Sequence, residues 1–461
     1  MTTILDQQWQ PQPEAQKLVD ELLATVLSKC DGAVLLSKRM VHDTGTRLKD
    51  WLDTIVAPKT PALRSRLLDV GFDRRAMPGA PECFVHEGGL FPRIVLEDGN
   101  DTRIFVKVDS VIDFLAAWNI ADTPGTNDDD VEGDPLSPMR QARAFRGERA
   151  EVWVVERHGY RGFVAPKPDA DRGLLMIRHA EAFRRRARDF DTEAAGFDHL
   201  DRLVDAAIAD LGEDIACAAF FAAEREYWQR RNRAAQVQKS RQDKLGLGWA
   251  NHDHHTYRSS RESFTRLVGL FEKLGFKARE RFYAGEEAGW GAQVLEQPES
   301  GIVIFADVDL SPEEVMGNFA HEPLEPRKEL GTVGLWCGLH GEAILQAGMH
   351  HLECQFDFEA LKDQLEAAHI DTMDPFTNFP FLRQAFTAGE RWPVAEKRIA
   401  RLLSAGLITP AQAAQFRAQG AIGSHLENLE RNDGFKGFNQ KGISEIIAKT
   451  DPRRQAQLIG A

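Results

Sequence analysis

Cysteine is scarce in this chain of 461 residues, which has five: Cys30, Cys83, Cys217, Cys337 and Cys354. An odd number without any C-x-x-C pair argues against a disulfide framework and against a thiolate zinc site. Long apolar runs are also absent, because none approaches the roughly 20 residues that span a bilayer. The first residues lack the basic and apolar regions of a signal peptide. We therefore expect a protein of the reducing cytoplasm that has no membrane partner.

Positive charge is in deficit, with 57 lysines and arginines against 71 aspartates and glutamates and a formal net charge of -14. A negative field of this size repels nucleic acid and anionic lipid, so no nucleic-acid partner is expected. The remaining composition is that of an ordinary globular protein and leaves the oligomeric state open. Histidine is the exception, since nine of the 14 histidines lie after residue 250. This skew indicates that the C-terminal part uses imidazole.

Hydrophobic patterning divides the chain into three regions. Residues 1–175 form a mixed α/β region in which helical spacing near the start gives way to short strands after residue 80. Residues 176–246 are strongly helical and connect the two other regions, and the helical pattern breaks at Gly246 and Gly248. Residues 247–461 form the third region, which holds the crowded histidines.

The third region repeats one order of elements. A strand over residues 251–258 precedes a helix whose apolar residues from Phe264 to Leu274 lie on one face. Three strand candidates follow at 277–283, 291–296 and 301–308. A second strand at 348–356 again precedes an amphipathic helix. Two tandem βαβββ modules predict an α+β fold with a curved sheet, whose concave face is a natural place for a metal held by inward-pointing strand residues.

Two histidines stand at equivalent places in the two modules. His254 and His351 each lie on a strand just ahead of an amphipathic helix, so tandem folding would bring the two imidazoles into one cavity. Strand alternation should turn the neighbouring His255 and His350 to the opposite face. The candidates for a third ligand are Glu296, His425, Glu427 and Glu430. Two imidazoles and one carboxylate on one side of a metal leave positions open for substrate and oxygen, as in non-haem Fe(II) oxygenases.

Short motifs around these residues resemble the vicinal-oxygen-chelate superfamily, and within it the 2-oxo acid dioxygenases. His254 lies in Asn-His-Asp-His-His-Thr-Tyr, which is similar to the I-D-H strand of 4-hydroxyphenylpyruvate dioxygenase and hydroxymandelate synthase. His351 lies in Gly-Met-His-His-Leu, similar to that family's G-V-Q-H-I, and Glu427 lies in His-Leu-Glu-Asn-Leu-Glu-Arg, similar to its F-x-E-x-I-Q-R. The resemblance covers less than half of the chain. It implies that His254, His351 and Glu427 hold Fe(2+), with O2 as co-substrate.

Two departures from the family bear on the substrate. Where the hydroxyphenylpyruvate enzymes place the second phenylalanine of an aromatic clamp, this chain has Ile443, so that only Phe438 remains of the clamp. Arg258 follows His254 by four residues, which on a strand directs both side chains to one face. The 2-oxoadipate dioxygenases have H-x-x-x-R at this strand, and their arginine holds the distal carboxylate of the substrate. The resemblance therefore favours an aliphatic 2-oxo diacid, and a surface ion pair is the alternative role for Arg258.

The resemblance as a whole implies an Fe(II)-dependent dioxygenase that decarboxylates a small-molecule 2-oxo acid such as 2-oxoadipate and yields a hydroxylated acid and CO2. The predicted substrate contacts are Arg258, Phe438, Gln293, Arg383 and Gln384. The predicted lid, which would exclude water, contains Phe435, Lys441 and Ile443. The alternatives are a 4-hydroxyphenylpyruvate-type or extradiol dioxygenase, a metal-dependent lyase or isomerase, and a small-molecule binding protein without turnover.

Overall fold

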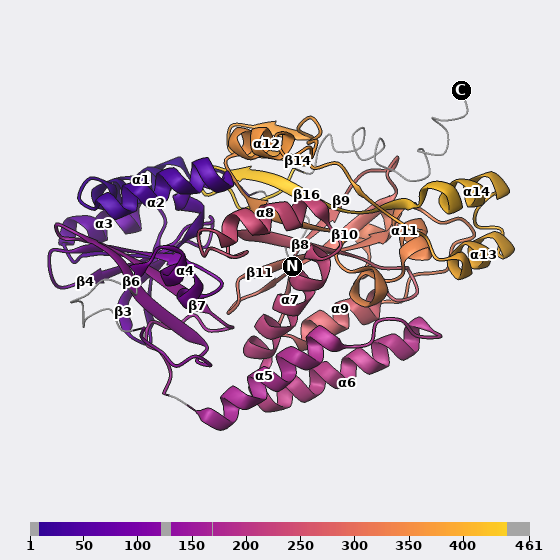
Figure 1. Ribbon diagram of the computed structural model, residues 1–461, viewed down its shortest axis with the longest axis horizontal. Coiled ribbons are helices and arrows are strands. Elements are labelled where there is room, and N and C mark those ends of the chain that lie inside the picture. The colour runs from indigo at the N-terminus through magenta and orange to yellow at the C-terminus, as the bar shows by residue number, and fades with distance from the viewer. Residues whose placement is uncertain (1–8, 121–130, 168, 440–461) are drawn as a thin grey trace.

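The computed structural model describes residues 9–120, 131–167 and 169–439 of the chain. It contains two mixed β-sheets, and helices lie between and below them (Figure 1). The N-terminal sheet is drawn in indigo and purple, and the C-terminal sheet runs from pink to yellow. Within this described part, no helix has both the length and the apolar composition needed to cross a membrane.

Two βαβββ modules build the C-terminal sheet. The first consists of β8 (His252–Arg258), α9 (Phe264–Lys273), β9 (Lys277–Tyr283), β10 (Trp290–Gln297) and β11 (Ile302–Asp309). The second consists of β12 (His351–Gln355), α12 (Phe358–Glu366), β13 (Thr377–Phe379), β14 (Leu382–Phe386) and β16 (Ala421–Arg431). Between the modules lie α10 (Pro312–Met316) and α11 (Thr332–His340), and β15 (Glu390–Trp392), α13 (Glu396–Ser404) and α14 (Pro410–Gln419) precede β16.

The strand order of this sheet is β13-β14-β16-β12-β8-β11-β10-β9. In each module the last strand pairs in parallel with the first, β11 with β8 and β16 with β12. The two first strands, β8 and β12, pair antiparallel at the centre. The sheet therefore has the same order on either side of the β8–β12 pair, and the predicted tandem βαβββ fold is confirmed.

Local sequence explains how the first module forms. In α9 the apolar positions predicted to share a face, among them Phe264, Leu267 and Phe271, are fully buried. Gly275 follows the helix with φ +83°, a left-handed conformation that glycine adopts without a steric cost. Strand β11 is buried along its whole length, because one face meets the helices and the other faces the cavity described below.

The N-terminal sheet repeats the same plan, which its sequence pattern does not reveal. A first module contains β1 (Leu52–Pro58), α3 (Pro61–Asp69), β2 (Asp73–Met77), β3 (Ala80–Val85) and β4 (Arg93–Glu97). A second module, with one strand fewer, contains β5 (Thr102–Lys107), α4 (Val111–Ala117), β6 (Met139–Gly147) and β7 (Ala150–Arg157). The strand order is β2-β3-β4-β1-β5-β7-β6, with β1 antiparallel to β5 at the centre.

Helices complete both halves. Helices α1 (Pro13–Leu27) and α2 (Asp31–Arg39) belong to the core of the N-terminal sheet. Helices α5 (Ala170–Arg185), α6 (Glu193–Leu211), α7 (Glu213–Gln229) and α8 (Arg233–Asp243) connect the sheets. Phe221 of α7 packs against His255 and Tyr257 of β8, with ring centroids 5.3 and 6.2 Å away. Helix α7 therefore covers one face of the C-terminal sheet and leaves the other for the site.

Candidate metal centre

Three neighbouring strands bring four possible metal ligands together. His254 lies on β8, His351 and Glu353 lie on β12, and Glu427 lies on β16. Because β12 runs between the other two strands, Glu353 is in register with His254 on one side and with Glu427 on the other. All four side chains are buried and line one cavity. The structure thus brings together the three predicted ligands and adds a fourth.

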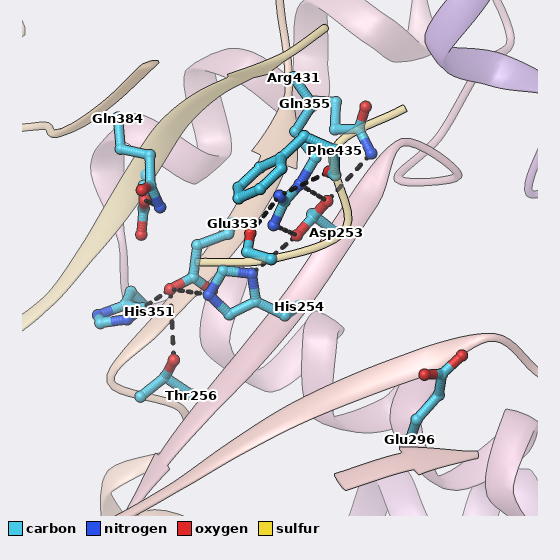
Figure 2. Close-up of polar contacts among 12 residues, drawn as sticks. Asp253, His254, Thr256, Glu296, His351, Glu353, Gln355, Gln384, Arg431 and Phe435 are labelled. Carbon is cyan, nitrogen blue, oxygen red and sulfur yellow. Dashed lines mark hydrogen bonds and ion pairs between the residues drawn. The ribbon is translucent and has the colours of Figure 1, made fainter. Parts of the chain in front are cut away.

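Glu353 lies at the centre of this group (Figure 2). Its Oε1 atom is 3.0 Å from Nε2 of His254 and 2.5 Å from Nε2 of His351. Thr256 donates a hydrogen bond of 3.3 Å to the same oxygen. Donor atoms of His254, Glu353 and Glu427 all lie within 4.8 Å of one another. Two donors that each bind one metal ion at about 2.1 Å are separated by roughly 3 Å, so these spacings fit a shared cation.

A second layer of contacts orients the ligands. Nδ1 of His254 lies 2.9 Å from a carboxylate oxygen of Asp253, which directs Nε2 of the ring towards Glu353. Asp253 is held in turn by Arg431, at 2.8 and 3.0 Å, and by Gln355, at 3.0 Å. Metal-binding histidines characteristically donate their second ring N–H to a carboxylate in this way. On the other side, Gln384 donates a hydrogen bond of 2.8 Å to Oε1 of Glu427.

The electrostatics of the two glutamates also fit a cation. Burial raises the pKa of Glu353, but the imidazoles of His254 and His351 outweigh this effect and hold it below its usual range. Burial and the neighbouring Glu353 carboxylate raise the pKa of Glu427 well above its usual range. Two buried carboxylates this close repel each other when both are charged. Oε2 of Glu353 is buried and has no hydrogen-bond partner in the described part of the chain, so a bound cation would satisfy this oxygen and allow both groups to ionise.

Three of the five predicted substrate contacts line the cavity. Arg258 is only 8% exposed, its Nε lies 3.9 Å from Oδ2 of Asp307, and its guanidinium carbon lies 5.7 Å from the ring centroid of Trp336. The alternative role of Arg258 as a surface residue is therefore wrong. The ring of Phe438 lies 4.9 Å from that of His254, and Gln384 reaches the cavity beside Glu427.

The other two predicted contacts do not reach the cavity. The side-chain amide of Gln293 donates to the backbone carbonyls of Glu280 and Val294, at 3.0 Å each. Arg383 pairs with Glu359 at 2.5 Å near the surface. It precedes Gln384 on β14, and strand alternation therefore turns it away from the cavity.

The predicted lid is described only in part. Phe435 does not line the cavity but packs on Phe381, with ring centroids 4.7 Å apart, in a small core cluster beyond it. Its carbonyl accepts a hydrogen bond from Arg431. Lys441 and Ile443 lie outside the described residues.

The two neighbouring histidines behave differently from each other. His255 faces away from the cavity, as alternation predicts, and packs on Phe221. His350 lines the cavity, and its ring centroid lies 4.8 Å from that of His351 and 4.9 Å from that of His425. The prediction for His350 is wrong because β12 begins only at His351, so the alternation of a strand does not extend to the residue before it.

Two of the four candidates for the third ligand point elsewhere. Glu296 lies 3.3 Å from Lys436, well apart from the ligand group in Figure 2. Glu430 pairs with Arg47 at 3.0 Å. His425 lines the cavity together with Glu427. Glu353 was not identified from the sequence. A signal for it was present, since a residue two positions after His351 on a strand lies on the same face as His351.

A comparison of this chain with known proteins finds matches among solved structures. No family model matches the chain, and no curated protein matches it. One similar structure is a glyoxalase-superfamily protein from Ralstonia eutropha JMP134, with 13% identity, 58% of this chain and 95% of that chain covered, and a TM-score of 0.29. Methylmalonyl-CoA epimerase from Mycobacterium tuberculosis is 13% identical over 40% of this chain and 89% of its own, with a TM-score of 0.23.

A variant of 4-hydroxymandelate synthase from Streptomyces coelicolor is also similar, at 12% identity over 71% of this chain and 90% of its own, with a TM-score of 0.25. The fold of this chain follows from its own strand order, and the chemistry of the site follows from the residues that line the cavity.

Proposed function

We propose that the protein is a metal-dependent oxygenase that decarboxylates an aliphatic 2-oxo diacid, such as 2-oxoadipate, with Fe(II) and O2. The observation that carries this proposal is the position of Arg258. Its buried guanidinium lines the same cavity as His254, His351 and Glu427. A cation and a metal in the wall of one cavity suit a substrate that carries two negative groups.

In this proposal His254, His351 and Glu427 hold the metal. Fe(II), when bound, supplies the activation of O2 that the decarboxylation needs. The chain's own residues orient the reactants. Asp253 fixes the ring of His254, and Gln384 fixes the carboxylate of Glu427 through its 2.8 Å hydrogen bond.

Arg258 is the residue that would select the substrate. A guanidinium can grip a carboxylate through two parallel N–H···O bonds, which an ammonium cannot do. Asp307, which faces Arg258, has its pKa raised well above the usual range by burial. The nearby Arg258 opposes this effect of burial on Asp307.

The shape of the cavity favours a compact substrate. Its volume is about 80 Å³, well below the roughly 300–1,000 Å³ of typical ligand pockets. The ring of Phe438 fills part of it and packs on Phe305, with centroids 4.6 Å apart. A flat aromatic substrate would need this ring to move further than a slim aliphatic chain would.

One observation favours a second function, that of a metal-dependent lyase or isomerase. Oxygenases of this kind leave several metal positions open for substrate and O2. Glu353 lies where it could serve as a fourth protein ligand, which would leave fewer open positions. A zinc or nickel ion held by two imidazoles and two carboxylates could still polarise a substrate carbonyl without any use of O2.

The test is oxygen uptake by purified protein loaded with Fe(II), measured with a panel of 2-oxo acids that includes 2-oxoadipate and 4-hydroxyphenylpyruvate. We expect uptake of O2 and release of CO2 in equal amounts with an aliphatic diacid. Absence of both with every acid in the panel would overturn the proposal. Turnover that requires zinc or nickel and proceeds without O2 would establish the second function instead.

A further inference from the structure

A second cavity of about 530 Å³ lies at the junction of the two halves of the chain, and we call it the junction cavity. Its wall contains the ends of β5 and β7, one side of α7, Trp249 and Ala250 ahead of β8, and His252 at the start of β8. It shares no lining residue with the metal centre. Its volume lies within the range of typical ligand sites, roughly 300–1,000 Å³.

The wall of the junction cavity is positively charged, although the chain as a whole carries a net charge of -14. Four carboxylates line the wall, fewer than the basic side chains, which are Lys107, Arg157, Arg161, Arg184, Arg225 and Lys239. Two of these carboxylates already have partners within the protein. Asp53 binds both Arg93, at 2.7 Å, and Arg157, at 2.9 Å. Oδ2 of Asp109 accepts a hydrogen bond of 2.6 Å from the backbone N–H of Trp249.

Three of these cations have no carboxylate partner in the part of the chain that the structure describes, and one of them, Arg161, donates instead to the backbone carbonyl of Pro298 at 2.6 Å. Among the described residues, none offers the Lys107 ammonium a hydrogen bond or an acidic oxygen within 4.0 Å, and Arg225 contacts only Nε2 of His255, at 3.3 Å. Burial lowers the pKa of Lys107 to about 8; Asp53 opposes this effect, and the nearby Arg225 adds to it. Nδ1 of His252, in the same wall, is buried, and no described residue forms a hydrogen bond with it. Lys107 and Arg225 are both partly exposed, and neither pairs with a carboxylate among the described residues, so a bound anion would complete this arrangement.

We propose that the junction cavity is a binding site for a small anion with a carboxylate or phosphate group, held by Lys107 and Arg225. Both side chains can donate charge-assisted hydrogen bonds to such a group. The volume exceeds what a single phosphate needs, so the ligand has room for an organic portion. The site is separate from the metal centre, since Arg225 contacts His255 on the face of β8 opposite His254.

The experiment measures binding to the full chain by differential scanning fluorimetry and isothermal titration calorimetry. The probes are inorganic phosphate, pyrophosphate, succinate and citrate, each compared with sodium chloride at the same ionic strength. We expect at least one probe to raise the Tm in a saturable manner and to give a calorimetric heat, because a ligand that binds only the folded state stabilises it. The phosphate and carboxylate probes show which of the two groups the site prefers.

Two variants test the residues. Lys107→Met and Arg225→Gln should each weaken binding about tenfold or more, as expected for the loss of one charge-assisted hydrogen bond. Lys107→Met should not lower the Tm of the ligand-free protein, because it removes a partly buried charge that pairs with no carboxylate among the described residues. The matched control is Lys273→Met, at a lysine that already pairs with Asp201 and Asp205 on the surface. This control should bind the probes as the wild type does.

Three results would overturn the proposal. The first is the absence of any saturable Tm rise and any heat with all four probes. The second is unchanged probe affinity in both Lys107→Met and Arg225→Gln. The third is a clear loss of Tm in ligand-free Lys107→Met, since that would mean the ammonium already has its partners in the free protein.

Discussion

Glu353 sets the charge balance of the candidate metal centre. With this residue and Glu427 both ionised, two carboxylates offset the charge of a divalent cation. Without a cation, Glu353 is charged and Glu427 is held neutral, as the opposite directions of their pKa shifts indicate. Metal binding should therefore release a proton from this pair.

Metal content provides the first prediction at this scale. Replacement of His351 by Ala removes a donor atom from the ligand group, so the purified variant should retain little iron after dialysis. Glu353→Gln keeps the size of the side chain but loses its charge, and we expect metal affinity to fall by about 10-fold or more. Elemental analysis by inductively coupled plasma mass spectrometry measures both.

The matched control for these variants is Glu296→Gln. It changes a glutamate of the same sheet that pairs with Lys436, away from the ligand group. Its iron content should equal that of the wild type. Wild-type iron content in His351→Ala would show that the ligand assignment is wrong.

Arg258 gives the second residue-scale prediction. Arg258→Lys keeps the positive charge but loses the planar fork, so kcat/KM for 2-oxoadipate should fall about 10-fold or more. The same variant should process 2-oxohexanoate, which lacks the distal carboxylate, as well as the wild type does. Steady-state oxygen uptake with both acids checks this. An equal fall for the two acids would contradict a role in recognition of the distal carboxylate.

At the scale of elements, the pair of Asp253 and Arg431 joins the start of β8 to the end of β16. Both side chains are almost fully buried, and Arg431 also donates to the carbonyls of Phe435 and Gly437. Burial raises the pKa of Asp253, but Arg431 outweighs it and holds the value below the usual range. The charged carboxylate therefore depends on its partner.

We predict that Arg431→Met lowers the free energy of unfolding by about 3–5 kcal/mol, because it leaves a buried carboxylate uncompensated. Urea unfolding followed by circular dichroism measures this change. The double variant Arg431→Met/Asp253→Asn should recover part of the loss. A double variant no more stable than the single one would mean that packing, and not charge, accounts for the effect.

The two sheets show what the sequence can and cannot predict. The C-terminal modules were predictable because their helices α9 and α12 have clear apolar faces and their strands carry recognisable motifs. The N-terminal repeat was not, because β2 is almost entirely exposed and gives no alternation of buried and exposed positions. Module order in that half becomes visible only through strand pairing.

The candidate site likewise contains residues that the sequence predicts and residues that it does not. His254, His351 and Glu427 follow from repeat position and motif, and the structure brings them into one cavity. Glu353 shares a strand face with His351, as its spacing indicates, but its contact with His254 depends on the pairing of β12 with β8, which no single segment of the sequence reveals. Phe435 was misplaced for a related reason, since the path of the chain after β16 depends on its contacts with Phe381 and Arg431.

For the whole molecule, buried neutral histidines predict a dependence of stability on pH. Burial lowers the pKa of His340 to about 3, and its Nε2 lies 3.1 Å from the carbonyl oxygen of Ile422. In the unfolded chain this group would titrate near pH 6.5. Its folded pKa is the lower one, so the unfolded state binds the proton first. Stability is then fully present above pH 6.5 and falls as the pH decreases from there towards 3.

The fourth prediction follows from this loss of stability at low pH. Between pH 6 and pH 4 the free energy of unfolding should fall by up to about 1.4 kcal/mol per pH unit for each such histidine. His340→Gln should flatten this slope, whatever its effect on stability at pH 7. Urea titrations of both proteins across this range measure the two slopes. Identical slopes would show that His340 contributes nothing to acid sensitivity.

Strand β16 lies inside the C-terminal sheet, between β12 and β14, although it is the last strand of that sheet along the chain. During synthesis, β12 and β14 emerge from the ribosome before their common neighbour exists. Their unpaired edges are then open to association with other chains, which makes the unfinished protein prone to aggregation. Because Glu427 arrives on this same strand, the ligand set is complete only once the sheet closes. A metal ion that arrived before β16 had joined the sheet would lack the Glu427 carboxylate of the proposed ligand set.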